Sequence, residues 1–139
     1  MTVSQWMTKS VFTIKPKDTL KQAHEVMTKH RINQLPVVID DKVVGIVTDR
    51  DVREAYPSSV RLMRGKDIDD FAESHIVEEV MTFNVVTISP QASLREAAQH
   101  VRKQRFGALP VVEHGKLVGI ITRSDLLDAA LAGEFPGHA

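Results

Sequence analysis

The sequence contains no cysteine, and its 18 Lys and Arg residues are balanced by 18 Asp and Glu residues. The lack of cysteine excludes disulfide bonds, zinc sites built on thiolates and a thiol nucleophile, and it fits a reducing compartment. The zero net charge gives no long-range attraction towards nucleic acid or an anionic membrane. We therefore expect neither a disulfide-stabilised protein nor one that binds nucleic acid.

Long apolar runs and signal-like segments are also missing. No run approaches the roughly 20 residues that a helix needs to cross a bilayer, and the segment from Met1 to Trp6 lacks the basic, then apolar order of a signal peptide. We expect a cytoplasmic protein without a membrane partner.

The sequence also lacks the patterns of a metal or catalytic site. Its six histidines include no His-x-x-x-His or His-Glu-x-x-His pair, so no metal site is predicted. The serines and scattered acids form no arrangement of nucleophile and base. We expect no enzymatic activity.

An internal repeat organises the chain. Residues 3–52 align with residues 77–126 without a gap, and about twenty of the fifty positions are identical. The segment Gly-Ile-Val-Thr-Asp-Arg-Asp at residues 45–51 returns 74 residues later as Gly-Ile-Ile-Thr-Arg-Ser-Asp. We predict a first domain at residues 1–56, a connector at 57–76, a second domain at 77–132 and a tail at 133–139.

Each copy is predicted to fold as strand, helix, strand, strand, helix, which gives an α/β (α+β) protein. Residues 11–14 and 85–88 are β-prone and end near prolines, so they are expected to be brief strands. Capping-box patterns at Thr19 and Ser93 begin helices with apolar residues at helical spacing. The apolar runs on either side of residues 40–42 and 114–116 predict hairpins, and the last helices start at Thr48 and Thr122.

A three-stranded sheet of about fifty residues is too small to stand alone, so we expect the copies to pack with pseudo-twofold symmetry. The charged connector is expected to be mostly solvated, with Leu62, Met63, Ile68 and Phe71 as candidate anchors. The apolar final helices have no third element to cover them, which predicts a homodimer.

The two Thr-x-x-Asp motifs lie where a strand is expected to enter a helix. Such a junction offers backbone N–H groups and a helix dipole to an anion, and the carboxylate of Asp51 or Asp125 could accept hydrogen bonds from a ligand's hydroxyl groups. The same spacing also fits a helix capping box. The motif alone leaves both explanations open.

Several motifs in fixed order, twice over, resemble a pair of CBS domains, the regulatory Bateman module. They are Met-Thr before the first strand, Leu-Pro-Val-Val at the second, and Gly-Ile-Val-Thr-x-x-Asp at the third, and they cover nearly the whole chain. The charged connector resembles that of stand-alone bacterial CBS proteins of the acetoin-utilisation type.

The resemblance implies that an adenosine-containing ligand (AMP, ADP, ATP or S-adenosylmethionine) binds in the cleft between the paired repeats. It assigns the ribose hydroxyls to Asp51 and Asp125, and the 5′ substituent to Thr48 and Thr122. The residues that would line the adenine slot are Thr13, Pro36, Val37, Thr87, Pro110 and Val111.

The chain departs from some adenylate-sensing members of that family, which carry basic residues just ahead of Leu-Pro-Val. Here these positions hold Asn33-Gln34 and Gly107-Ala108. Phosphate contacts would therefore come from other residues, unless the ligand carries little negative charge; the candidates are Arg31, Arg50, Arg105 and Arg123. The two loops differ in charge, because Asp49 and Arg50 of the first copy correspond to Arg123 and Ser124 of the second. This difference predicts unequal affinities of the two sites.

The resemblance implies a regulatory, ligand-sensing module that signals through helix packing to a second subunit or to a client enzyme or transporter. The alternative is a constitutive dimerisation or adaptor protein whose clefts hold no nucleotide.

Overall fold

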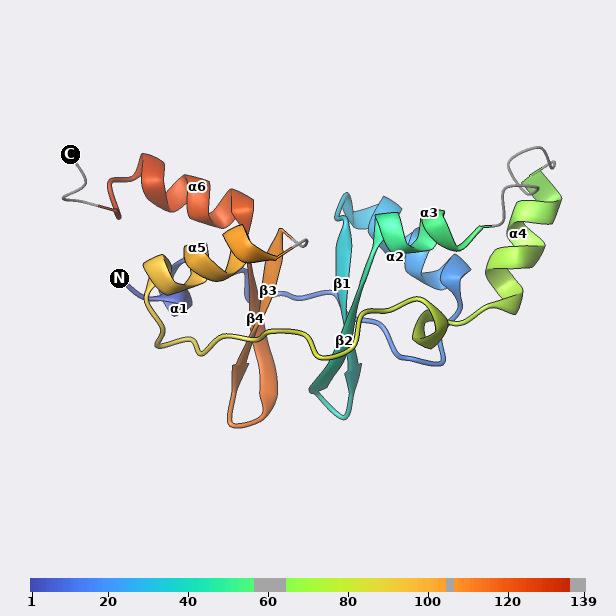
Figure 1. Ribbon diagram of the computed structural model, residues 1–139, viewed down its shortest axis with the longest axis horizontal. Coiled ribbons are helices and arrows are strands. Elements are labelled where there is room, and N and C mark those ends of the chain that lie inside the picture. The colour runs from blue at the N-terminus through green and yellow to red at the C-terminus, as the bar shows by residue number, and fades with distance from the viewer. Residues whose placement is uncertain (57–64, 105–106, 136–139) are drawn as a thin grey trace. The chain divides into compact units, whose positions relative to one another are not determined.

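The computed structural model describes residues 1–56, 65–104 and 107–135 of the chain. Its first part runs α1 (Val3–Trp6), α2 (Leu20–His30), β1 (Gln34–Ile39), β2 (Lys42–Thr48) and α3 (Asp49–Ala55). Helix α4 (Gly65–Ser74) and the 3-10 helix η2 (Val77–Glu79) follow. The second part runs α5 (Leu94–Lys103), β3 (Ala108–Glu113), β4 (Lys116–Thr122) and α6 (Arg123–Leu131), as labelled in Figure 1. The predicted mixture of helices and strands is confirmed.

The two β-hairpins have the same register. Gln34 lies opposite Thr48 in β1 and β2, and Ala108 lies opposite Thr122 in β3 and β4. Each hairpin also has a register shift in its first strand, between Val37 and Val38 in β1 and between Val111 and Val112 in β3. The turns begin with two residues of positive φ, at 50° and 66° in the first hairpin and 54° and 77° in the second, as a tight hairpin turn requires.

The prediction of a third strand in each copy is wrong for the described residues. Instead, Ile14 and Ile88 each form a single parallel bridge, to Val37 and Val111. The amide of Ile14 donates to the Pro36 carbonyl at 3.1 Å, and Val38 donates back to Ile14 at 2.9 Å. The ladder stops on both sides because the next donors would be the nitrogens of Pro36 and Pro16, which carry no hydrogen. Pro110 has the same effect in the second copy.

A side-chain cap begins the first long helix of each copy. Thr19 accepts a hydrogen bond from the Gln22 amide at 3.1 Å, and Ser93 accepts one from the Glu96 amide at 3.1 Å. Each helix buries the apolar face that its spacing predicts; the buried residues are Leu20, Ala23 and Met27 in α2, and Leu94, Ala97 and Val101 in α5.

The compact units do not coincide with the sequence repeats. One unit is formed by residues 12–85, and the other by residues 1–11 and 86–139; we call them the β1–β2 unit and the β3–β4 unit. Residues 3–8, the first leader, pack in the β3–β4 unit (Figure 1). There, Thr8 and Ile120 exchange backbone hydrogen bonds of 2.8 and 2.9 Å. Residues 77–82, the second leader, pack in the β1–β2 unit, where Thr82 and Ile46 exchange bonds of 2.8 and 3.1 Å. Each repeat therefore completes the other's unit.

Glycine permits this close approach. A Cβ atom at Gly119 would lie 2.6 Å from Sδ of Met7 and 3.0 Å from the carbonyl oxygen of Thr8. At Gly45 the corresponding distances, to Met81 and Thr82, are 2.8 and 2.9 Å. The repeated Met-Thr and Gly-Ile motifs are thus packing partners, each pair joining residues from different repeats.

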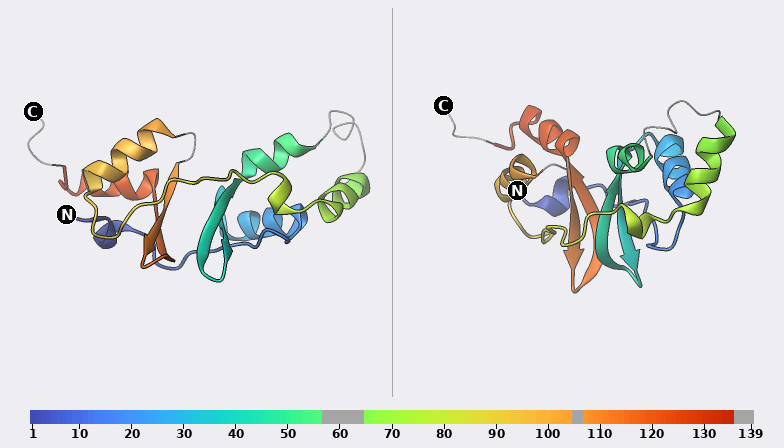
Figure 2. Two further views of the ribbon diagram at one scale, coloured as in Figure 1. Left: turned by 60° about the horizontal axis from the view of Figure 1, so that its bottom comes forward. Right: turned by 45° about the vertical axis from the view of Figure 1, so that its right-hand side comes forward.

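The second half of the connector forms α4, a helix that was not predicted. This helix lies along α2 (Figure 2), with Ala72 only 4% exposed and Phe71 packed against the core. Nζ of Lys21 also contacts Oε1 of Glu73 at 2.7 Å. Phe71 is therefore an anchor as predicted, whereas Ile68 is 36% exposed and Leu62 and Met63 lie outside the described residues.

Candidate functional site

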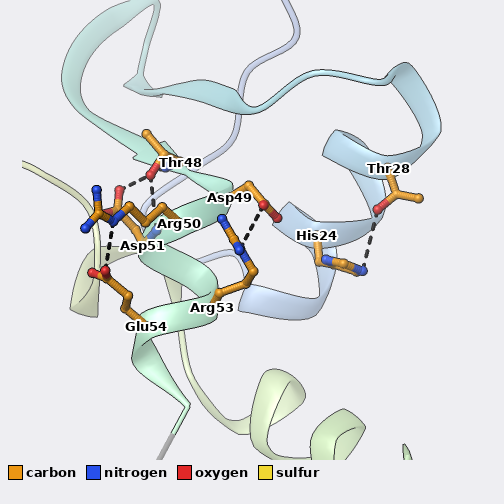
Figure 3. Close-up of polar contacts among 8 residues, drawn as sticks. All are labelled: His24, Thr28, Thr48, Asp49, Arg50, Asp51, Arg53 and Glu54. Carbon is orange, nitrogen blue, oxygen red and sulfur yellow. Dashed lines mark hydrogen bonds and ion pairs between the residues drawn. The ribbon is translucent and has the colours of Figure 1, made fainter. Parts of the chain in front are cut away.

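Both Thr-x-x-Asp motifs form complete capping boxes. Thr48 precedes α3, where its amide donates to Oδ2 of Asp51 at 2.9 Å and its hydroxyl oxygen accepts from the Asp51 amide at 3.1 Å (Figure 3). Thr122 and Asp125 make the same two bonds at the start of α6, at 2.9 and 3.2 Å, and the Thr122 hydroxyl also donates to Oδ2. The capping explanation of the motif is therefore confirmed at both positions.

Capping occupies only part of each carboxylate. An ionised carboxylate offers two oxygens and about four acceptor positions. Within the described ranges of the chain, Oδ1 of Asp51 and Oδ1 of Asp125 accept no hydrogen bond, and both residues are half-buried. Each capping box thus holds one carboxylate in a fixed position with an oxygen still available to a ligand.

The helix N-termini have less to offer an anion than the sequence suggests. The amide of Asp49 donates to the Asn33 carbonyl at 2.8 Å, and that of Arg123 donates to the Gly107 carbonyl at 2.8 Å. The amides of Asp51 and Asp125 serve the capping boxes. Because these backbone donors already have protein acceptors, phosphate recognition would depend more on side chains.

Side-chain charge distinguishes the two loops. Nε of Arg50 lies 2.8 Å from Oε1 of Glu54, and Nε of Arg53 lies 3.0 Å from Oδ2 of Asp49 (Figure 3). The hydrogen bond with Glu54 raises the pKa of the Arg50 guanidinium. In the second copy Arg123 forms no ion pair and no side-chain hydrogen bond with the described part of the chain.

Four of the predicted adenine-lining residues lie on β1 and β3, the strands that pair with those leading into the Thr-x-x-Asp motifs. Pro36 and Val37 are buried in β1, as are Pro110 and Val111 in β3. Val37 and Val111 are 0% exposed, so their side chains belong to the core and only their backbone could meet a ligand. Thr13 and Thr87 are exposed and directly precede the bridging isoleucines.

Each compact unit contains one full set of the predicted residues. The β1–β2 unit holds Thr13, Pro36, Val37, Thr48, Arg50 and Asp51, and the β3–β4 unit holds Thr87, Pro110, Val111, Thr122, Arg123 and Asp125. Of the further phosphate candidates, Arg31 ends α2 with a left-handed φ of 55°, and Arg105 lies outside the described residues.

Two contacts next to these sets were not predicted from the sequence. The ring of Phe12 stacks on that of His30 with centroids 3.6 Å apart, beside Thr13, and the second copy has Val86 and Gln104 at these positions. The stem of Arg123 lies against Gly107, where a Cβ atom would be 3.4 Å from Cδ. Neither contact has a signal in the spacing of residues, because both join segments far apart in the chain.

Within the described segments, no three His, Cys, Asp or Glu residues are grouped so that they could hold a metal ion. No helix in that part of the chain is both long and apolar enough to cross a membrane.

Comparison with known proteins identifies the repeats. The CBS domain family model matches residues 3–58 and 77–132. A CBS domain-containing protein of Dictyostelium discoideum is 41% identical over 128 residues, which are 91% of this chain and 88% of that protein. The solved structure of CBSX2 from Arabidopsis thaliana in complex with AMP is 28% identical, with a TM-score of 0.78 over 96% of this chain and 98% of that one.

A second solved complex shows the same fold with other adenosine ligands. It is the CBS domain pair of protein MJ0100 with 5-methylthioadenosine and S-adenosyl-L-methionine, 26% identical, with a TM-score of 0.76 over 97% of this chain and 98% of that one.

Proposed function

Because this chain belongs to the CBS domain family, we propose that it is a regulatory module that binds an adenosine-containing nucleotide between its two CBS repeats. The observation that carries the proposal is the pair of capped carboxylates, each with an unused oxygen, in a complete set of the residues that the family resemblance assigns to the ligand. The AMP complex of CBSX2 and the S-adenosylmethionine complex of the MJ0100 domain pair support the choice of ligand class.

The chemistry of the capped carboxylate suits a ribose. Vicinal hydroxyl groups donate two hydrogen bonds, and a bond to a charged acceptor contributes about 1.5–3 kcal/mol. The bonds from Thr48 and Thr122 hold the acceptors in place before the ligand arrives, so binding immobilises fewer side-chain rotamers. Recognition of this kind needs no catalytic group, and we propose a cytoplasmic, non-catalytic protein.

The signal is proposed to pass through α6 to a second copy of the chain. This helix is apolar on two faces: Leu126 and Ala129 are buried, whereas Leu127 is 64% exposed and Leu131 is 87% exposed. A second copy would remove this apolar surface from water, which is favourable in proportion to its area. A client enzyme or transporter could use the same face. Light scattering should give a dimer that Leu131→Glu dissociates; a monomeric wild-type protein at micromolar concentration would contradict the dimer.

Calorimetry with AMP, ADP, ATP and S-adenosylmethionine tests the ligand. A micromolar dissociation constant corresponds to about −8 kcal/mol. Asp51→Asn and Asp125→Asn should each weaken one site by about ten- to a hundredfold, because the amide oxygen can still cap the helix but the charge is lost. Absence of heat from all four compounds at millimolar concentration would exclude the proposed ligand class.

One observation favours the alternative, a constitutive dimerisation or adaptor protein. Asp51 and Asp125 cap their own helices, and that role would explain both residues even if no nucleotide bound. This alternative predicts a melting temperature that ignores nucleotides. A binder gains about 2.7 kcal/mol of stability when the free ligand is at 100 times its dissociation constant, so a thermal-shift series decides between the two.

A further inference from the structure

We propose that Arg123 makes the Asp125 site selective for phosphorylated adenosine compounds, whereas the Asp51 site takes adenosine compounds with little negative charge. The inference rests on the proposed function and ranks two sites that the sequence leaves unranked. It concerns the charges that differ between otherwise matching loops, at residues 49 and 50 in one and 123 and 124 in the other.

The arginines beside Asp51 are already neutralised. Arg50 is bound to Glu54 at 2.8 Å and Arg53 to Asp49 at 3.0 Å, all within α3 (Figure 3). A phosphate could recruit either guanidinium only by displacing a carboxylate, and the carboxylates of Asp49 and Glu54 would repel it. This loop therefore favours a ligand with little negative charge near its 5′ position.

The loop beside Asp125 has the opposite arrangement. Ser124 replaces Arg50, Leu127 replaces Arg53, and Arg123 occupies the position of Asp49. Arg123 is exposed, and in the described part of the chain no carboxylate is paired with it. A guanidinium is planar and offers five N–H donors, a geometry that suits bidentate binding of phosphate.

Gly107 keeps this arginine close to the motif. The backbone amide of Arg123 donates to the Gly107 carbonyl at 2.8 Å. A Cβ atom at residue 107 would lie 3.4 Å from Cδ of Arg123 and 3.6 Å from its Cγ and Nε, so the aliphatic stem rests on the glycine. The first copy has Asn33 at this position. A stem held against the backbone has less rotamer freedom to lose when the guanidinium binds a ligand.

Single-site proteins separate the two loops. Asp51→Asn leaves the Asp125 site, Asp125→Asn leaves the Asp51 site, and each is titrated calorimetrically with adenosine and with AMP. The Asp125 site should prefer AMP by about ten- to a hundredfold, the worth of charge-assisted hydrogen bonds. Adding Arg123→Gln should remove that preference and leave adenosine affinity unchanged. The Asp51 site should show no preference for AMP, and the control Lys42→Gln, which removes a positive charge at the far end of the same hairpin, should not change its ratio.

The outcomes distinguish this inference from the proposed function. If the wild-type protein binds neither adenosine nor AMP at millimolar concentration, the proposed function fails and the inference fails with it. If binding occurs but Arg123→Gln leaves the AMP-to-adenosine ratio unchanged, or the Asp51 site prefers AMP equally, only the inference is overturned. Should Arg123→Gln fail to fold, Arg123→Lys serves instead: its single charge without the planar fork should retain only part of the preference.

Discussion

The β1–β2 and β3–β4 units share one backbone plan but are covered and charged differently. Both have the same hairpin register, the same register shift and a glycine pressed against a methionine from the other repeat's leader. Only the β1–β2 unit has α4 packed on its first long helix, and it pairs its loop arginines internally. The backbone contacts are thus alike in both units, whereas the charged residues beside the two Thr-x-x-Asp motifs differ.

The largest expected effect comes from truncating the matching core leucines. Leu35 and Leu109 are both 0% exposed, so Leu35→Ala and Leu109→Ala should each cost about 2–5 kcal/mol through lost burial and a cavity. Urea unfolding followed by circular dichroism measures the loss in free energy of unfolding. A loss well below about 1 kcal/mol in either variant would contradict the burial of these leucines.

A smaller loss of stability is expected from substituting the two glycines that pack against the leaders. Gly119→Ala and Gly45→Ala should each cost about 1–3 kcal/mol by overpacking, because the added Cβ meets a backbone carbonyl as well as a methionine sulfur. Adding Met7→Ala to Gly119→Ala should recover only part of the loss. The control is Gly107→Ala, where the nearest atom is a flexible arginine carbon at 3.4 Å. Equal urea midpoints for Gly107→Ala and Gly119→Ala would contradict the exchanged-leader packing.

The smallest effect reports on α4, the element that only one unit has. Burial, reinforced by the charge of Asp69, raises the pKa of Tyr56 above its ordinary value, and the ring of Phe71 lies 4.9 Å from that of Tyr56. Folding therefore favours the protonated phenol, and the stability linked to it is present at neutral pH and lost as the pH rises through the raised pKa.

Phe71→Ala should lower the pKa of Tyr56, because it removes part of the cover. Tyrosinate absorbance during a pH titration measures this residue alone, since Tyr56 is the chain's single tyrosine. The control Leu131→Ala, in the β3–β4 unit, should leave the midpoint where it was. An unchanged midpoint in Phe71→Ala would mean that α4 does not cover Tyr56.

Features that depend on residues close together in the sequence could be predicted, whereas features that depend on contacts between remote residues could not. The helix caps at Thr19, Ser93, Thr48 and Thr122, and the hairpins between the strands, were predicted correctly because each depends on residues within a few positions. The third strand was predicted wrongly because the ladder is limited to one residue by two prolines, and one of them, Pro36, lies on the partner strand, remote in sequence. Helix α4 was not predicted because its apolar residues are explained only by their packing against α2 and Tyr56, which are remote in sequence.

The sequence by itself determined the duplication, the family, the local elements and the identity of the candidate ligand-binding residues. The tertiary structure decided which leader completes which unit, since a Met-Thr segment fits any glycine that lets the backbone approach, and only packing selects the one in the other repeat. It also decided which arginines are neutralised. Arg50 and Arg123 are the same residue type in the sequence. In the structure the carboxylate of Glu54, one helical turn away, pairs with Arg50, whereas the stem of Arg123 lies against Gly107.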